Sequence, residues 1–207
     1  GDVLTDLDLP ALLERHESSG ARAPLALYPV EDPSAYGLVR RNPDGEITGY
    51  LEKPDPADID TDEVSAGAYV LEKSILDMVP AGRDVSIERS VFPELVGDGL
   101  YSRRLEGYWM DIGTPERYLE ACWDILDGKV SSEPGEMVDA RGSYVAESAV
   151  VDPSAEVAAH AFVDDNADVG ADAEIGPKAV IGMGAQGGAG ALIEASALHP
   201  GCFVGDG

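Results

Sequence analysis

The last third of the chain repeats its hydrophobic pattern every six residues. Valine or isoleucine occupies each sixth position, and alanine follows four residues after it. An α-helix repeats every 3.6 residues and a strand every two, so neither explains this period. An aliphatic and a small position recurring together every six residues predict a parallel β-helix over residues 144–207. The aliphatic positions are Val145, Val151, Val157, Val163, Val169, Ile175, Ile181 and Ile193.

The repeat is predicted to become irregular towards its end. Gly187 occupies an aliphatic position, Phe203 breaks the alanine positions that reach Ala197, and Val204 comes one residue early. The pattern stops at Gly207 without a capping helix. Because solenoids need capped ends, we expect the protein to continue beyond this point.

Before residue 127, segments with strand and helix patterns alternate. This mixture predicts an α/β domain over residues 1–127, joined to the β-helix by a polar linker at 128–143. Strands are expected at 23–30, 37–40, 47–51, 64–71, 100–105 and 108–110, with a hairpin turn at 42–45. Helices are expected at 9–16, 73–78, 86–96 and 115–126, with Ser86 and Thr114 as the N-caps of the last two.

Charge and cysteine content narrow the classes of function. Asp and Glu number 40 against 14 Lys and Arg, for a net charge of −26, which argues against nucleic acid or an anionic membrane as partner. No apolar run of about 18 residues predicts a membrane span. The two cysteines suit a reducing cytoplasm. The dispersed acidity favours a high-salt cytoplasm, with ordinary acidic bias as the alternative.

Three short clusters contain residues suited to chemistry: Gly1-Asp2, Tyr36-Gly37 with Glu52-Lys53-Pro54, and Trp109 to Pro115. Each has an ordinary structural explanation, as a residue flanking a helix, a solvated ion pair or a strand-to-helix turn. Their order along the chain, with Ser65 to Tyr69 between them, resembles that in the sugar-phosphate nucleotidyltransferases, the NDP-sugar pyrophosphorylase family. The resemblance covers nearly the whole chain.

The resemblance implies a Rossmann-like nucleotidyltransferase domain, of which residues 1–127 are the C-terminal part, followed by a left-handed β-helix. It implies that Asp2 and Asp111 are catalytic and hold Mg²⁺, which prefers carboxylate and phosphate oxygens. Each lies at an expected strand end where a loop begins, and α/β sheets bind ligands at the carboxyl ends of their strands. A sugar 1-phosphate would attack the α-phosphorus of a nucleoside triphosphate and release pyrophosphate.

The same resemblance implies a sugar site. Glu52 would accept the sugar hydroxyls, Lys53 would hold the sugar phosphate as a compact charge, and Gly37 would allow close approach. Ser65 and Gly67 would complete this site, although Ser65 replaces the asparagine that the family often has. Within the family, the chain most resembles the members that use GTP and mannose 1-phosphate. Members that transfer a thymidylyl or uridylyl group to glucose 1-phosphate are the alternative.

Two further expectations concern the ends of the chain. The family's Gly-x-Gly-Thr-Arg nucleotide loop is expected upstream of Gly1, so the 207 residues alone are expected to be inactive. The β-helix is expected to drive homo-oligomerisation. Another possibility is acyl transfer by a β-helix histidine, His160 or His199, although a solvated turn histidine is the favoured explanation of His160.

Overall fold

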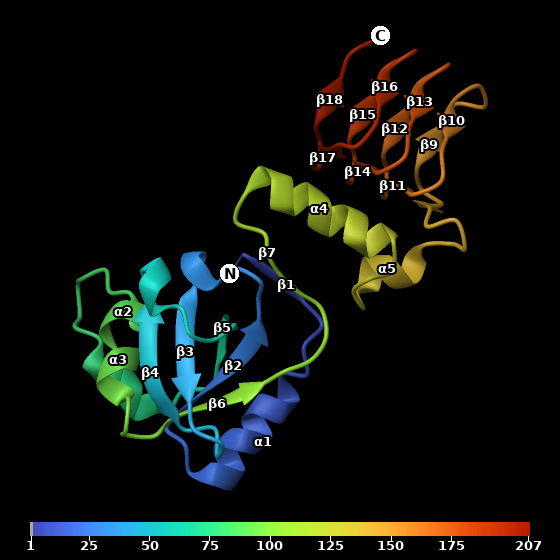
Figure 1. The fold of residues 1–207 in the computed structure, drawn as a ribbon. Coiled ribbons are helices and arrows are strands. Elements are labelled where there is room, and N and C mark those ends of the chain that lie inside the picture. Colours follow the sequence, from blue (N-terminus) through green and yellow to red (C-terminus); the bar gives the residue numbers. More distant parts are fainter. Residues whose placement is uncertain (1) are drawn as a thin grey trace. The chain divides into compact units, whose positions relative to one another are not determined.

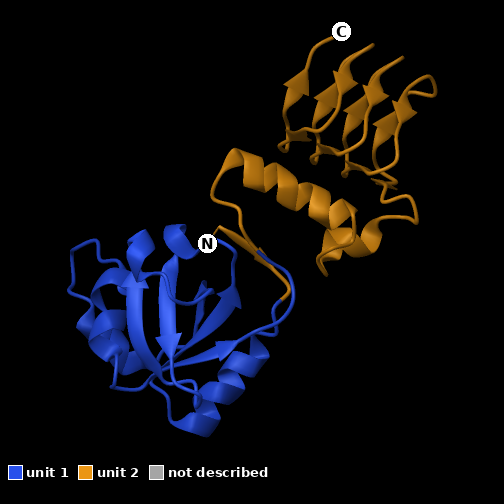
Figure 2. Ribbon diagram, in the orientation of Figure 1, with its two compact units in different colours: residues 1, 7–109 blue, residues 2–6, 110–207 orange. Residues whose placement is uncertain are grey.

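The computed structural model describes residues 2–207, so Gly1 of the Gly1-Asp2 cluster lies outside the described residues. The chain divides into two compact units (Figure 2). Unit 1 contains residues 7–109, and unit 2 contains residues 2–6 and 110–207. This boundary at residue 109 separates compact units. The predicted ends of the α/β domain at 127 and of the linker at 143 stay a prediction.

Unit 1 is built on a five-stranded mixed sheet in the order β4-β3-β5-β2-β6 (Figure 1). Only β2 and β6 are parallel, and the other neighbours are antiparallel. The predicted α/β class and the hairpin are confirmed. The strands are β2 Ala23–Pro29, β3 Gly37–Arg41, β4 Ile47–Glu52, β5 Glu63–Tyr69 and β6 Leu100–Arg104. The helices are α1 Pro10–Ser19, α2 Ile87–Ser90 and α3 Phe92–Leu95, with 3-10 turns η1 Pro33–Ala35, η2 Pro56–Asp58 and η3 Lys73–Met78.

The helix expected over residues 86–96 is two short helices. Ser86 caps α2 as predicted, since its hydroxyl accepts a hydrogen bond from the amide of Arg89. The helix breaks at Val91, because Pro93 has no N–H to donate to the preceding turn. The break places Phe92 and Leu95 in the core, where both are fully buried.

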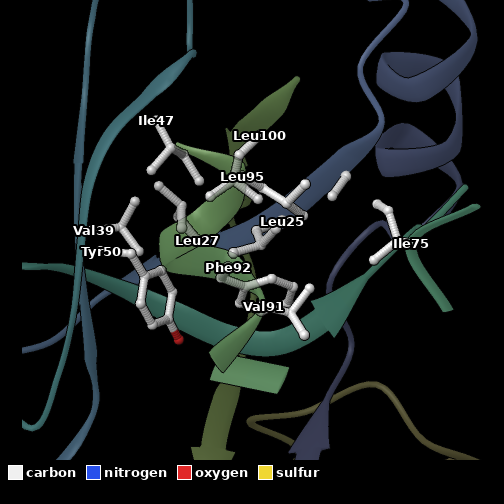
Figure 3. Packing of buried hydrophobic residues seen from close by; sticks show 11 residues of the cluster. Leu25, Leu27, Val39, Ile47, Tyr50, Ile75, Val91, Phe92, Leu95 and Leu100 are labelled. Carbon is white, nitrogen blue, oxygen red and sulfur yellow. The ribbon is translucent and has the colours of Figure 1, made fainter. Parts of the chain in front are cut away.

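The main core of unit 1 lies between the sheet and the α2–α3 segment (Figure 3). Alternate residues of β2, Leu25 and Leu27, point towards Phe92 and Leu95, as expected for a strand that buries one face. Tyr50 of β4 lies at the edge of this cluster and meets Phe92 edge-on, with ring centroids 5.5 Å apart. The sheet and these helices therefore fix the position of the Tyr50 ring.

Unit 2 begins with a two-stranded sheet and a capped helix. Strand β1 (Val3–Thr5) pairs with β7 (Trp109–Asp111), whose first residue belongs to unit 1. Thr114 caps α4 (Pro115–Leu126) by accepting from the amide of Arg117, as predicted. The predicted linker holds one more helix, α5 (Glu133–Met137), capped by Ser132.

The predicted parallel β-helix is confirmed. Up to Ile193, each paired residue faces the residue three hexapeptides further on, as Val163 does with Ile181. The alanines from Ala161 to Ala191 and the aliphatic residues from Val163 to Ile193 fill the interior. Its left-handed winding remains a prediction. The strands are β8 Tyr144–Val145, β9 Val150–Val151, β10 Glu156–Val157, β11 Ala161–Val163, β12 Asp168–Val169, β13 Glu174–Ile175, β14 Ala179–Ile181, β15 Gln186–Gly187, β16 Leu192–Ile193, β17 Ala197–Leu198 and β18 Phe203–Val204.

The predicted irregularity lies later than Gly187. Gly187 keeps the regular register opposite Val169, and Ile193 fills the space that its missing side chain leaves, since a Cβ there would meet Ile193 Cδ1 at 3.1 Å. The turn between Ile193 and Ala197 is one residue short, so Ala197 pairs with Val180. The placement of Ala197 among the inward alanines was therefore wrong.

The acidic residues of the β-helix are arranged differently from the simple stacking that the repeat suggests. Asp168 lies between Val150 and Gln186, so it has no carboxylate directly beside it in the ladder. Glu156 and Glu174, in contrast, lie directly opposite each other on neighbouring rungs. In residues 2–207, no helix combines the length and apolar character that a membrane span requires.

Candidate active site

Trp109 anchors the start of the Trp109-to-Pro115 motif. Its indole N–H donates to the carbonyl of Ala66 at 3.0 Å. The ring stacks on Tyr28 and meets Tyr36 edge-on, both with centroids 5.5 Å away. The motif's tryptophan thus has a structural role in unit 1, two residues before the acid that the resemblance makes catalytic.

Asp2 and Asp111 converge on Gly113. A Cβ added at Gly113 would lie 3.0 Å from Asp2 Oδ2 and 3.0 Å from Asp111 Oδ1. Asp111 is held in place, because its Oδ1 accepts from the amide of Gly113 at 2.9 Å and its Oδ2 from Arg117 at 3.1 Å. The structure therefore brings the two predicted metal ligands together around a residue without a side chain.

Strand pairing explains how these two acids meet. Asp2 directly precedes β1, whereas Asp111 is the last residue of β7. The two are adjacent because β1 pairs with β7, where the amide of Ile112 donates to the Asp2 carbonyl at 2.7 Å. The expectation of a strand end agrees with Asp111, the last residue of β7, and stays a prediction for Asp2.

The donor set fits a hard divalent cation. Two carboxylates facing a gap that a side chain would fill match the protein's share of a Mg²⁺ site, which commonly uses one or two carboxylates with water and phosphate oxygens. In the described part of the chain, no group of three or more His, Cys, Asp or Glu could hold a metal. A metal at Asp2 and Asp111 would thus take further ligands from water or substrate.

A cavity of about 710 Å³ adjoins this pair within unit 2. Its wall runs from Asp2 through Gly113 and Thr114 to Tyr118 of α4, and on to Ser196 and His199 of the β-helix. Asp2 thus has open space beside its carboxylate, where a substrate could be placed.

The sugar-site residues predicted in unit 1 meet at the end of the β3–β4 hairpin. Gly37 lies directly opposite Glu52 in the ladder, and the amide of Lys53 donates to the carbonyl of Tyr36 at 2.9 Å. A side chain at Gly37 would come within 3.2 Å of Glu52 Oε2 and would overlap the Tyr50 hydroxyl. The missing side chain of Gly37 therefore makes room for Tyr50.

Tyr50 is a candidate site residue that the sequence reasoning missed. Its hydroxyl is buried and makes no hydrogen bond of ordinary geometry in residues 2–207, although the side chains of Ser65 and Glu88 lie near it. Burial first, and then the charge of Glu88, raise the pKa of Tyr50 far above its ordinary range, and Ser65 lies near enough to oppose the shift. A buried hydroxyl without a partner is costly, so this atom is suited to bind a ligand oxygen.

Glu88 of α2 was missed as well. Burial and the neighbouring Glu52 carboxylate raise the pKa of Glu88, while Tyr50, Arg89 and Lys53 act in the opposite direction. Arg89 is also 4.0 Å from Glu52 Oε1. Two carboxylates and a phenol thus gather where the resemblance implied one carboxylate. The sequence signal was weak: Glu88 follows only the expected cap Ser86.

Lys53 and Gly67 both have left-handed backbone conformations. Lys53 has φ 51°, which is strained for a residue with a side chain, and such strain concentrates at functional sites. Gly67 has φ 73° and lies in a bulge where Leu25 and Leu27 face Tyr69 and Ser65. Glycine suits this bulge because it adopts positive φ without steric cost.

The predicted site residues fall into two groups. Asp2 and Asp111 lie in unit 2, while Gly37, Glu52, Lys53, Ser65 and Gly67 lie in unit 1. Within unit 1, Gly37, Glu52 and Ser65 gather around Tyr50, whereas Gly67 is tied to the group only by its amide's 3.5 Å contact with Ser65 Oγ.

The β-helix histidines occupy structural positions. His160 sits in a turn with φ 55°, and its Nδ1 lies 3.0 Å from Asp127 Oδ1. His199 stacks on Tyr118, with ring centroids 5.5 Å apart. These contacts favour the turn explanation of His160 over a catalytic one.

Comparison with known proteins agrees with these features. A sequence profile described as nucleotidyl transferase matches residues 1–128. The chain is 38% identical over 158 residues to a mannose-1-phosphate guanylyltransferase of Mycobacterium tuberculosis, covering 75% of this chain and 43% of that protein. It is 35% identical over 159 residues to the mannose-1-phosphate guanyltransferases of Yarrowia lipolytica and Schizosaccharomyces pombe, with the same coverage.

The chain spans less than half of the length of these curated relatives. Enzymes of the matched family generally use a divalent metal, as the paired carboxylates suggest. The profile covers more than half of the chain and includes both groups of site residues. The chain therefore belongs to the nucleotidyl transferase family.

Proposed function

We propose that the protein containing this chain transfers a nucleotidyl group from GTP to mannose 1-phosphate, giving GDP-mannose and pyrophosphate. The observation that carries the proposal is the convergence of Asp2 and Asp111 on Gly113. The printed names of the relatives favour this substrate pair. Thymidylyl or uridylyl transfer to glucose 1-phosphate is the alternative.

In this proposal, Asp2 and Asp111 hold Mg²⁺, which supplies charge neutralisation for the phosphates when it is bound. Hydrogen bonds from Arg117 and the Gly113 amide orient the Asp111 carboxylate. Glu52 accepts sugar hydroxyls, and Lys53 binds the phosphate of the sugar. Catalysis then rests on positioning and charge, as in-line phosphoryl-type transfer requires.

Two smaller proposals accompany the activity. The cysteines Cys122 and Cys202 are both free, which supports a place in a reducing cytoplasm. Self-association through the β-helix would bury its exposed apolar side chains, among them Val150, Leu192 and Phe203. Gel filtration of the wild type against Phe203→Ser would test this self-association.

The activity is tested by pyrophosphate release with Mg²⁺. GTP with mannose 1-phosphate should give faster release than either thymidine or uridine triphosphate with glucose 1-phosphate. The 207-residue chain should be compared with a longer form that carries a Gly-x-Gly-Thr-Arg loop, and only the longer form should turn over. A preference of the longer form for glucose 1-phosphate would overturn the substrate assignment.

A further inference from the structure

Four of the chain's basic residues line one small cavity of unit 1, although the chain as a whole carries a net charge of −26. The cavity has a volume of about 330 Å³ and lies where α1, the turn between β3 and β4, and β6 come together (Figure 1). Its arginines are Arg15 of α1, Arg41 of β3, and Arg103 and Arg104 of β6. A cluster of one sign in a chain of the opposite sign calls for a physical explanation.

Nearby acids offset only part of this charge. Glu63 accepts hydrogen bonds from Arg41 Nε at 2.7 Å and Nη2 at 2.8 Å, and it lies 3.6 Å from Arg104. Among the described residues that line the cavity, Asp44 carries the acidic side chain, and this side chain is exposed to solvent. Two acids against four arginines leave an excess of positive charge around the cavity.

Arg15 is fixed in place with a donor to spare. Its Nη2 donates to the carbonyl of Asp44, and its guanidinium lies 5.2 Å from the centroid of the Tyr101 ring. Gly45, with φ 85°, lets the group approach closely, because a Cβ there would lie 3.0 Å from Arg15 Nη2. The Nε atom is nevertheless buried without a hydrogen-bond partner in residues 2–207. A buried donor left unsatisfied costs free energy that a bound acceptor would recover.

A purely structural role explains part of this arrangement. Arg103 ties β6 to α1 by donating from Nη1 to the carbonyl of Ala11 at 3.1 Å, and Arg15 ties α1 to the hairpin turn. These bonds use one nitrogen of each guanidinium. They do not explain why Arg104, whose side chain is 46% exposed and lies 3.6 Å from Glu63, faces the same cavity.

We propose that this cavity, lined by Arg15, Arg41, Arg103 and Arg104, binds a compact phosphate-type polyanion at a second site, separate from the sugar and carboxylate groups. Guanidinium forks match the geometry of phosphate oxygens in paired hydrogen bonds. The volume is at the small end of ligand pockets, so it suits an anion the size of pyrophosphate rather than a whole nucleotide. The inference does not depend on the proposed function.

The test is calorimetric titration of the chain with inorganic pyrophosphate, in EDTA and at constant ionic strength. Each charged hydrogen bond to the anion is worth about tenfold in affinity, so the double variant Arg15→Gln with Arg103→Gln should weaken binding by about 100-fold. The exposed Arg104→Gln should weaken it by about threefold or more without affecting the fold. Inorganic phosphate should bind more weakly than pyrophosphate.

Two control variants make the result specific. Arg40→Gln removes the same charge from the neighbouring position in β3, where Arg40 pairs with Asp60, and should leave the affinity within about twofold. Lys53→Ala should likewise leave it unchanged. Equal losses for Arg40→Gln and Arg104→Gln would reduce the effect to net charge, and loss of binding in Lys53→Ala would assign it to the sugar site. Either of these results would overturn the proposal. So would an unchanged affinity in Arg104→Gln, or the absence of pyrophosphate binding by the wild type.

Discussion

Asp2 and Asp111 each direct one carboxylate oxygen at the position where Gly113 lacks a side chain. Asp111 is held by two donors, whereas the structure shows no hydrogen bond to the Asp2 side chain from residues 2–207. The pair therefore combines one oriented carboxylate with one that is able to adjust. Filling the gap between them should be more damaging than its small volume suggests.

We predict that Gly113→Ala lowers metal affinity while leaving the fold intact. The added Cβ would lie 3.0 Å from both carboxylate oxygens, closer than ordinary contacts, so the carboxylates must move apart. The paramagnetic resonance of Mn²⁺ titrated into the chain measures the affinity, and circular dichroism verifies the fold. Gly205→Ala is a suitable control, because its backbone lies outside the left-handed region and a Cβ there would meet only Phe203 Cε1, at 4.0 Å, within the part of the chain that the structure describes. Unchanged Mn²⁺ binding in Gly113→Ala would mean that the metal binds elsewhere.

Lys53 allows its charge and its backbone strain to be separated. Lys53→Ala and Lys53→Gly should weaken binding of mannose 1-phosphate equally, because both remove the ammonium group. Lys53→Gly should be the more stable of the two by about 1 kcal/mol, because only glycine adopts φ 51° without strain. Titration calorimetry and urea unfolding measure the two quantities. Wild-type affinity in either variant would remove Lys53 from the sugar site.

The half-buried carboxyl of Glu88 should make the stability of the folded chain depend on pH. Burial and the Glu52 carboxylate raise the pKa of Glu88 above its ordinary 4.5. The protonated carboxyl therefore contributes to the stability of the folded state below pH 4.5, and this stabilisation is lost as pH rises through the raised pKa. Glu88→Gln removes the penalty and should be more stable than the wild type at pH 8, with the advantage shrinking towards pH 4.5. Urea unfolding at several pH values tests this, with the exposed Glu94→Gln as control. An advantage that does not vary with pH would mean that Glu88 is fully solvated.

The β-helix and the order of elements followed from the sequence because the period of six and the turn residues are local signals. The shortened turn before Ala197 was harder to place, since Ala197 continues the alanine spacing by coincidence and only the pairing with Val180 shows its true position. Tyr50 and Glu88 were missed because their importance comes from long-range packing around Gly37. No sequence spacing encodes that proximity.

Gly187 and Ile193 should show coupled effects on stability. Gly187→Val should destabilise the β-helix by about 1–3 kcal/mol, because the valine would overlap Ile193 Cδ1, 3.1 Å from the position of a Cβ. Adding Ile193→Ala should restore part of the loss by making room. A double-mutant cycle of urea unfolding measures the coupling. Simple additivity of the two losses would mean that Ile193 does not fill the space at Gly187.

The acidic surface should make stability depend on salt. Repulsion between exposed charges reaches about 10 Å at 0.1 M salt and about 3 Å at 1 M, so the melting temperature should rise towards molar KCl. Glu174→Gln removes the charge directly opposite Glu156 and should raise the melting temperature in dilute buffer more than in 1 M KCl. Glu147→Gln, in an exposed turn, serves as control. A melting temperature that is flat or falls with salt would leave the charge as ordinary acidic bias.

The most direct measurement of the central claim is pyrophosphate release by the full-length protein carrying Asp111→Asn. Asparagine keeps an acceptor for the Gly113 amide but loses the charge that a metal requires. Turnover of GTP with mannose 1-phosphate should fall by about 100-fold or more, with little change in melting temperature, while Asp98→Asn, at an exposed ion pair with Arg22, should retain full turnover. Wild-type turnover per folded molecule in Asp111→Asn would contradict the assignment of Asp111 to catalysis.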